Sequence, residues 1–138
     1  MKGKIYFDND FIFNDGVHGE KLIIILNEPH IGNKEPYLVV RVTSDKPQRY
    51  SKAKPHCNSD IDIYFIPKSL KEFFDSDTYV QLSPIFEYTA LEFLCKGTQK
   101  KLQEKGNLST HIFNSIMNCI KKSDDISDKH YKMLFKKK

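Results

Sequence analysis

Basic side chains and one aromatic ring gather between residues 41 and 54, and this combination suits binding to a nucleic acid. The stretch holds one tyrosine, one acidic residue and five basic ones: Tyr50, Asp45, Arg41, Lys46, Arg49, Lys52 and Lys54. Cations can contact phosphates while a base stacks on a ring, as in proteins that bind single-stranded RNA. The composition therefore predicts RNA contacts by Arg41, Arg49, Tyr50, Lys52 and Lys54, although a solvated surface loop explains it equally well.

Two histidines are candidates for proton transfer or RNA contact, because an imidazole titrates near neutral pH. His18 follows the turn signal Asn14-Asp15-Gly16, so we expect it near the tip of an exposed loop from 14 to 20, where it can contact RNA. His56 follows the basic stretch and is the better candidate for a catalytic acid or base. The simpler interpretation of both is an ordinary loop histidine.

Other catalytic signatures are missing from the sequence. No grouping of His, Cys, Asp and Glu has the spacing of a metal site, and no glycine-rich phosphate loop or nucleophile elbow occurs. We therefore expect neither a cofactor nor a metal ion. The three cysteines, Cys57, Cys95 and Cys119, lack paired spacing, which predicts buried or spare thiols.

Length and composition indicate one globular domain. A chain of 138 residues can bury a core, and ten Phe and seven Tyr supply large apolar side chains. The longest apolar run, from Leu22 to Leu26, is far shorter than the ~20 residues of a membrane helix, and no secretory segment is recognisable. We expect a cytoplasmic protein with no membrane contact. Residues 91–138 carry half of the 22 Lys and Arg side chains, which permits a polyanionic partner without requiring one.

Three apolar stretches in the first third of the chain predict consecutive strands. They cover residues 4–13 with an end or bulge at 8–10, then 21–27, then 37–43. The run from Leu22 to Leu26 is apolar on both faces, which is typical of a central strand. In the third stretch apolar residues alternate with Arg41 and Thr43, so these two side chains are expected on one face.

The remainder predicts a long loop, two further strands and a helical C-terminus. The loop covers 45–58, and the strands cover 60–66 and 78–83, the second ending at or near Pro84. A short helix is expected from Ser69 through Phe74, a helical turn over 89–96, and either helix or a charged edge strand over 98–105. An amphipathic helix is predicted from about 108 to 122, because apolar residues recur at helical spacing: Ile112, Phe113, Ile116, Met117 and Ile120. A last short helix is expected over 127–135.

Several of these segments resemble those of the MazF/PemK/Kid family of bacterial toxins. Gly3-Lys4-Ile5-Tyr6 is similar to the family's opening Gly-Asp-Ile-Tyr, and Gly19 to Asn27 is similar to its Gly-x-Arg-Pro-Val-Val-Val-Leu-Ser strand. Val39 to Ser44 resembles its third strand, which ends in Thr or Thr-Ser, and Asp77 to Ile85 resembles Asp-Ser-Val-Val-Leu-Leu-x-Gln-Ile. The likeness spans roughly residues 3 to 120.

The resemblance implies a mainly β fold with a C-terminal helix, within a single domain over 1–138. A small SH3-like barrel would cover about 3–105, the helix about 108–122, and a basic tail 123–138. It also implies a homodimer that cleaves single-stranded RNA without a metal ion, as the toxin partner of an antitoxin protein. Thr43 and Ser44 would contact phosphate, and Lys21 would take the place of an arginine. Lysine supplies charge without the planar fork of arginine.

Two departures from the family's pattern leave a second interpretation open. Lys21-Leu22 replaces Arg-Pro, and Pro84-Ile85-Phe86 replaces Gln-Ile-Arg, so that an expected arginine is missing. A fold survives such changes more readily than an activity does. The alternative is therefore a non-catalytic SH3-like barrel that serves as a protein-interaction or regulatory module.

Overall fold

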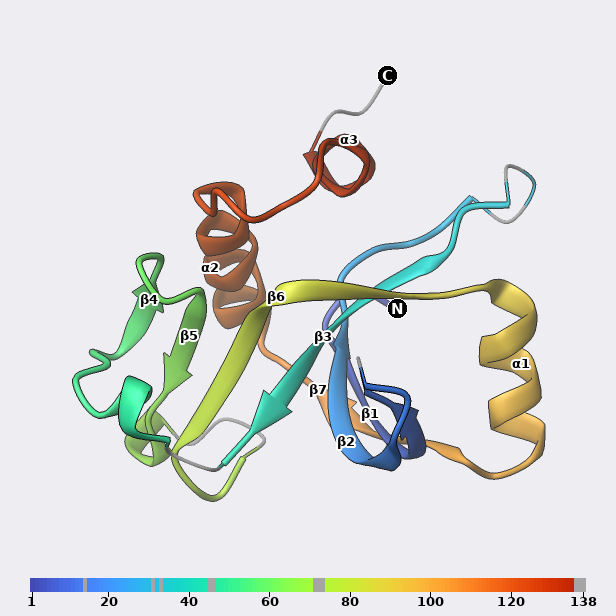
Figure 1. Cartoon of the computed structure of the whole chain (residues 1–138), viewed down its shortest axis with the longest axis horizontal. Helices are drawn as coiled ribbons and strands as arrows, with labels where there is room; N and C mark the ends of the chain where they lie inside the picture. Colours follow the sequence, from blue (N-terminus) through green and yellow to red (C-terminus); the bar gives the residue numbers. More distant parts are fainter. Residues whose placement is uncertain (14, 31, 33, 45–46, 71–73, 136–138) are drawn as a thin grey trace.

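The protein is built around one seven-stranded antiparallel sheet, seen in a computed structural model that describes residues 1–13, 15–30, 32, 34–44, 47–70 and 74–135 (Figure 1). The strand order is β4-β5-β6-β3-β2-β1-β7. In chain order the strands are β1 (Lys4–Ile12), β2 (His18–Ile25), β3 (Tyr37–Thr43), β4 (His56–Asn58), β5 (Ile63–Ile66), β6 (Thr78–Tyr88) and β7 (Leu102–Asn107). The α-helices are α1 (Ala90–Thr98), α2 (Thr110–Lys121) and α3 (Asp128–Phe135), and short 3-10 turns cover η2 (Gln48–Tyr50) and η3 (Lys68–Leu70).

The middle of the sheet is buried on both faces, as the apolar run in the second strand predicts. Ile24 and Val40 point into a core that α2 and α3 cover through Ile116 and Leu134. On the other face Phe93 of α1 joins a second core, where it contacts the rings of Tyr6 and Tyr37 at centroid distances of 5.1 and 4.4 Å. Figure 1 shows α2 beside β5 and β6, and α1 at the opposite end of the molecule.

The helical segments predicted over 89–96, 108–122 and 127–135 are confirmed, as are most of the predicted strands. β1 carries the expected bulge, because its pairing with β2 shifts register between Asp8 and Phe11. In the segment from 98 to 105, left open between helix and strand, Thr98 ends α1 and the edge strand β7 begins at Leu102. Thr89 begins α1 with a capping box and Ser109 caps α2, so each helix starts at a hydroxyl side chain that accepts from a backbone N–H.

Three boundary predictions were wrong. The loop expected over 14–20 ends early, because β2 already begins at His18 and pairs with Ile12. β6 continues past Pro84 to Tyr88: its pairing with β3 jumps from Gln81 to Phe86, and the proline lies in this irregular stretch where no ladder hydrogen bond is required. The loop over 45–58 contains η2 and β4. The helix expected from Ser69 falls partly outside the described residues, which show a 3-10 turn at Lys68–Leu70.

The predicted fold class, mainly β with a C-terminal helix, is confirmed. Closure of the sheet into an SH3-like barrel stays a prediction, because β4 and β7 are the edge strands and the described pairings do not join them. None of the helices in the described part of the chain is long and apolar enough to span a membrane.

The expectation of three thiols was wrong for two of the cysteines. Cys57 on β4 and Cys119 on α2 form a disulfide, and Cys95 on α1 is an exposed free thiol. The pairing brings together residues 62 positions apart, so their spacing in the sequence could not reveal it. The bridge attaches the edge strand β4 to the helix that covers the sheet.

Replacing Cys57 and Cys119 together with serine is expected to lower the free energy of unfolding by about 2–4 kcal/mol, because the bridge restricts the unfolded chain across a long loop. Urea unfolding of the variant and of the wild type measures the difference. Cys95→Ser is the matched control, and we expect it to leave stability unchanged. Equal stability of the double variant and the wild type would contradict a structural role for the bridge.

Candidate functional site

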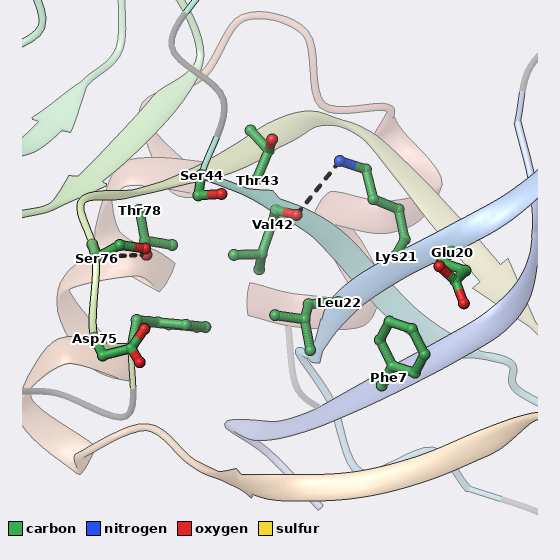
Figure 2. A pocket seen from close by; sticks show the side chains of 11 residues that line it. Phe7, Glu20, Lys21, Leu22, Val42, Thr43, Ser44, Asp75, Ser76 and Thr78 are labelled. Atoms are coloured by element: carbon green, nitrogen blue, oxygen red, sulfur yellow. Dashed lines mark hydrogen bonds between the residues drawn. The ribbon is translucent and has the colours of Figure 1, made fainter.

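A pocket of about 460 Å³ opens where β2 begins, β3 ends and β6 begins (Figure 2). This volume lies within the usual range for small-ligand sites. One part of its lining is apolar and consists of Phe7, Leu22, Val42 and Phe74. The remaining lining is polar and consists of Glu20, Lys21, Thr43, Ser44, Asp75, Ser76 and Thr78. We call this the strand-end pocket.

The pairing of β2 with β3 places the two kinds of lining. Leu22 and Val42 are directly opposite each other in the ladder, and Figure 2 shows both side chains pointing into the pocket. Because neighbouring residues of a strand point to opposite faces, Lys21 and Thr43 lie at its rim. The Nζ atom of Lys21 donates to the carbonyl of Val42 at 3.5 Å, which holds the ammonium group near the end of β3.

The structure therefore brings together three of the four predicted catalytic residues. Lys21, Thr43 and Ser44 line the same pocket although they come from two strands. Figure 2 also shows two carboxylates on different sides of it, with Glu20 next to Lys21 and Asp75 across the pocket. The arrangement offers one cation, four hydroxyl groups and two carboxylates around an apolar floor.

Several residues of this site were missed at the level of sequence. Asp75 and Ser76 come just before β6, and only the polar run Asp75-Ser76-Asp77 marks them. Phe7 was assigned to a strand and to nothing more. Lys105 of β7 places its Nζ atom 5.9 Å from the centre of the Phe7 ring, which adds a second cation beside the pocket.

His56 lies elsewhere. It is exposed on β4, and its Nδ1 atom is 3.0 Å from the hydroxyl of Tyr64, which in turn donates to Ser115 Oγ at 2.8 Å. It is not part of the pocket lining. His56 follows the basic stretch in sequence but does not lie near Lys21, because β4 pairs with β5 and is linked to α2 by the disulfide.

The predicted RNA-binding residues divide into two groups. Arg41, Arg49 and Tyr50 form a cluster on β3 and η2. Lys52 and Lys54 lie in the segment that precedes β4, and both are exposed. Lys46 lies outside the described residues. None of the five predicted RNA contacts lines the strand-end pocket.

His18, the remaining predicted RNA contact, belongs to a charged network at the bulge of β1. Its Nδ1 atom lies 2.6 Å from Asp10, whose other carboxylate oxygen accepts from Lys101 at 2.9 Å. The neighbouring Asp8 is fully buried and accepts hydrogen bonds from Lys96 at 2.7 Å and from Tyr88 at 2.6 Å. Burial and the bond to Asp8 hold the pKa of the Tyr88 hydroxyl far above its ordinary value. This network attaches α1, the end of β6 and the residue before β7 to β1.

The link at Asp10 predicts a specific dependence of stability on pH. Hydrogen bonds from His18 and then Lys101 lower the pKa of the Asp10 carboxyl from 3.8 to about 2. A lowered pKa in the folded state gives stability that is complete above the ordinary pKa and is lost as the pH falls towards 2. The advantage of wild type over Asp10→Asn should therefore be constant above about pH 4 and vanish near pH 2. Unfolding curves between pH 2 and 7 measure it, and an advantage that persists unchanged at pH 2 would contradict the assignment.

Known protein families give no further information about the strand-end pocket. Comparison of the sequence with protein-family models and with curated proteins found no match. Across the described residues, no group of three or more His, Cys, Asp and Glu side chains is arranged to hold a metal ion. Any function for the strand-end pocket therefore has to be argued from the side chains that line it.

Proposed function

We propose that the protein is a MazF/PemK-like endoribonuclease that cleaves single-stranded RNA at the strand-end pocket without a metal ion. One observation carries the proposal: Lys21, Thr43 and Ser44 line a single pocket that also contains carboxylates. The resemblance to that family singles out the same three residues from the sequence. The position of all three residues in one pocket supports the proposal, even though each sequence motif is weak by itself.

The chemistry needs four contributions, and the pocket offers a group for each. The 2'-oxygen of a ribose attacks the adjacent phosphorus, the bond from phosphorus to the 5'-oxygen breaks, and a 2',3'-cyclic phosphate forms. The Asp75 carboxylate accepts the proton of the 2'-hydroxyl, and the Lys21 ammonium faces the developing charge and donates a proton to the departing 5'-oxygen. Thr43 and Ser44 donate hydrogen bonds to the phosphate oxygens.

The apolar part of the pocket gives the proposal a place for a base. Phe7 offers a ring on which a base can stack, and single-stranded RNA is commonly held by such stacking. The Lys105 ammonium near the same ring can meet the next phosphate. A nucleotide would thus occupy the pocket with its base over Phe7 and its phosphate at Lys21.

The proposal extends to partners. It includes a homodimer whose activity is blocked by an acidic antitoxin protein. The formal net charge of +4 favours an acidic partner. Exposed Leu91 and Leu94 on α1 provide apolar surface that protein contacts could cover.

The test is incubation of the purified protein with long single-stranded RNA in EDTA, beside the double variant Thr43→Ala, Ser44→Ala. We expect the wild type to cut the RNA and the variant to cut it far more slowly. We expect the variant to fold, because both side chains are at the edge of the pocket. Circular dichroism and unfolding curves check this.

Two results would overturn the proposal: intact RNA after incubation with folded wild type, or equal cleavage by wild type and variant. RNA that is bound but left intact would favour the alternative, a non-catalytic module of the same fold. Binding by the wild type and cleavage are therefore measured on the same RNA.

A further inference from the structure

Two arginines lie close together on β3 and η2, in a cluster that is separate from the strand-end pocket. The guanidinium of Arg41 lies over the ring of Phe86 at 5.1 Å, and that of Arg49 lies over the ring of Tyr50 at 4.9 Å. Gln81 is directly opposite Arg41 in the ladder between β3 and β6. We call these residues, Arg41, Arg49, Tyr50, Gln81 and Phe86, the arginine cluster.

The cluster is held in place by aromatic packing and by hydrogen bonds. Tyr50 is buried and stacks on Tyr79, with centroids 5.3 Å apart. Its hydroxyl accepts from Arg49 Nη2 and from Gln81 Nε2, each at 3.3 Å. An oxygen that accepts two hydrogen bonds keeps its own hydrogen to donate. The two arginines, the glutamine and the tyrosine therefore form a fixed array of donors.

Within the described part of the chain, no carboxylate forms an ion pair with the arginines of this array. Two buried atoms, Arg41 Nε and Gln81 Oε1, have no hydrogen-bond partner among the described residues. Burial is the main cause that lowers the pKa of Arg41, and the neighbouring charge of Arg49 lowers it further, whereas Tyr50 opposes the shift. A half-buried cation beside a second cation is costly, and a bound anion removes that cost.

We propose that Arg41 and Arg49 bind a phosphate group, with Tyr50 donating a further hydrogen bond and Gln81 and Phe86 positioning the arginines. Guanidinium groups match the geometry of a phosphate, because their N–H groups can contact two oxygens at once. The ring of Phe86 and the hydroxyl of Tyr50 leave each guanidinium little freedom to lose on binding.

The site suits a phosphate of the same RNA strand that enters the strand-end pocket. Arg41 and Thr43 are two residues apart on β3, so their side chains share a face and stand about 7 Å apart along the strand. A chain running along β3 can thus present one phosphate to Thr43 and another to Arg41. The assignment of this phosphate to RNA rests on the proposed function. The binding of a phosphate group by Arg41 and Arg49 does not depend on it.

The test measures binding without cleavage. A fluorescent 2'-O-methyl oligouridylate lacks the free 2'-hydroxyl that cleavage needs, so its affinity reports contacts alone. Arg49→Gln should weaken binding about tenfold, the loss expected for a hydrogen bond to a charged group, and reduce the slope of log affinity against log salt by about 0.7. Lys132→Gln, an equal loss of charge at an exposed position on α3, should change neither.

A second arm uses inorganic phosphate, followed through the side-chain Nε–H signals of Arg41 and Arg49 in nitrogen-15 NMR spectra. Phosphate-dependent shifts of both signals, together with the loss of oligonucleotide affinity in Arg49→Gln, establish a phosphate site used by RNA. Shifts with phosphate but full affinity of Arg49→Gln for the oligonucleotide support a site for a free phosphate and overturn its assignment to RNA. Unmoved signals and unchanged affinity overturn the site itself, whatever the cleavage assay shows.

Discussion

Lys96→Met is expected to lower the free energy of unfolding by about 3–5 kcal/mol, the usual cost of leaving a buried charge without its partner. The side chain of Asp8 is 0% exposed and that of Lys96 is 16% exposed, so water cannot replace the lost ion pair. The Lys96 ammonium also donates to the carbonyl of Asp10 at 2.9 Å, at the bulge of β1. Chemical denaturation of wild type and variant at pH 7 measures the difference.

Lys101→Met, in the same network, is the matched control for Lys96→Met. Lys101 pairs with Asp10 in a setting where the two side chains are 41% and 29% exposed, and exposed pairs contribute at most about 1 kcal/mol. Lys101→Met should therefore cost far less than Lys96→Met. Adding Asp8→Asn to Lys96→Met removes the unpaired charge, and the double variant should recover part of the loss. Equal effects of the two lysine substitutions would contradict the distinction between a buried and an exposed pair.

This network was beyond what sequence could predict. Asp8-Asn9-Asp10 indicates only an interruption of the first strand, and the structure confirms a bulge there. The partners of Asp8 are 80 and 88 residues away in sequence, on β6 and α1. Lys96 comes close to Asp8 because β7, which follows α1 in the chain, pairs with β1. Local composition contains no trace of such long-range pairing.

Lys21→Ala is expected to slow RNA cleavage by about 10²–10³-fold, the usual effect of removing one group that stabilises charge in a transition state. Lys21 supplies the cation of the proposed mechanism, and its Nζ atom lies near the end of β3, next to Thr43 and Ser44. Lys21→Arg keeps the positive charge, but a guanidinium does not release a proton to the departing 5'-oxygen, so this variant should cut faster than Lys21→Ala and more slowly than wild type. Single-turnover cleavage of a labelled RNA measures all three proteins.

Lys132→Ala is the matched control for Lys21→Ala, because Lys132 is an exposed lysine on α3 and lies outside the pocket. We expect it to cleave at the wild-type rate. If Lys21→Ala cut as fast as Lys132→Ala, the ammonium would have no part in the reaction, and the assignment of its role would be wrong.

The pocket residues on the paired strands β2 and β3 could be predicted from the sequence. The pocket residues that come from a connecting segment could not. The resemblance singled out Lys21, Thr43 and Ser44, and the ladder between β2 and β3 explains why they meet, since Leu22 and Val42 are directly opposite. Asp75 was not predicted because it reaches the pocket from the segment before β6, not from the β2–β3 ladder. His56 was predicted from its nearness in sequence to the basic stretch, but the pairing of β4 with β5 carries it towards α2.

The most direct test of the central claim is the chemistry of the ends produced from RNA in EDTA. If the strand-end pocket directs attack by the 2'-hydroxyl, mass spectrometry should find 2',3'-cyclic phosphate and 5'-hydroxyl ends with the wild type. The same digest with Lys21→Ala should yield almost none, and DNA of the same sequence should stay intact. Uncut RNA, ends of another kind, or the same products from folded Lys21→Ala would contradict the account.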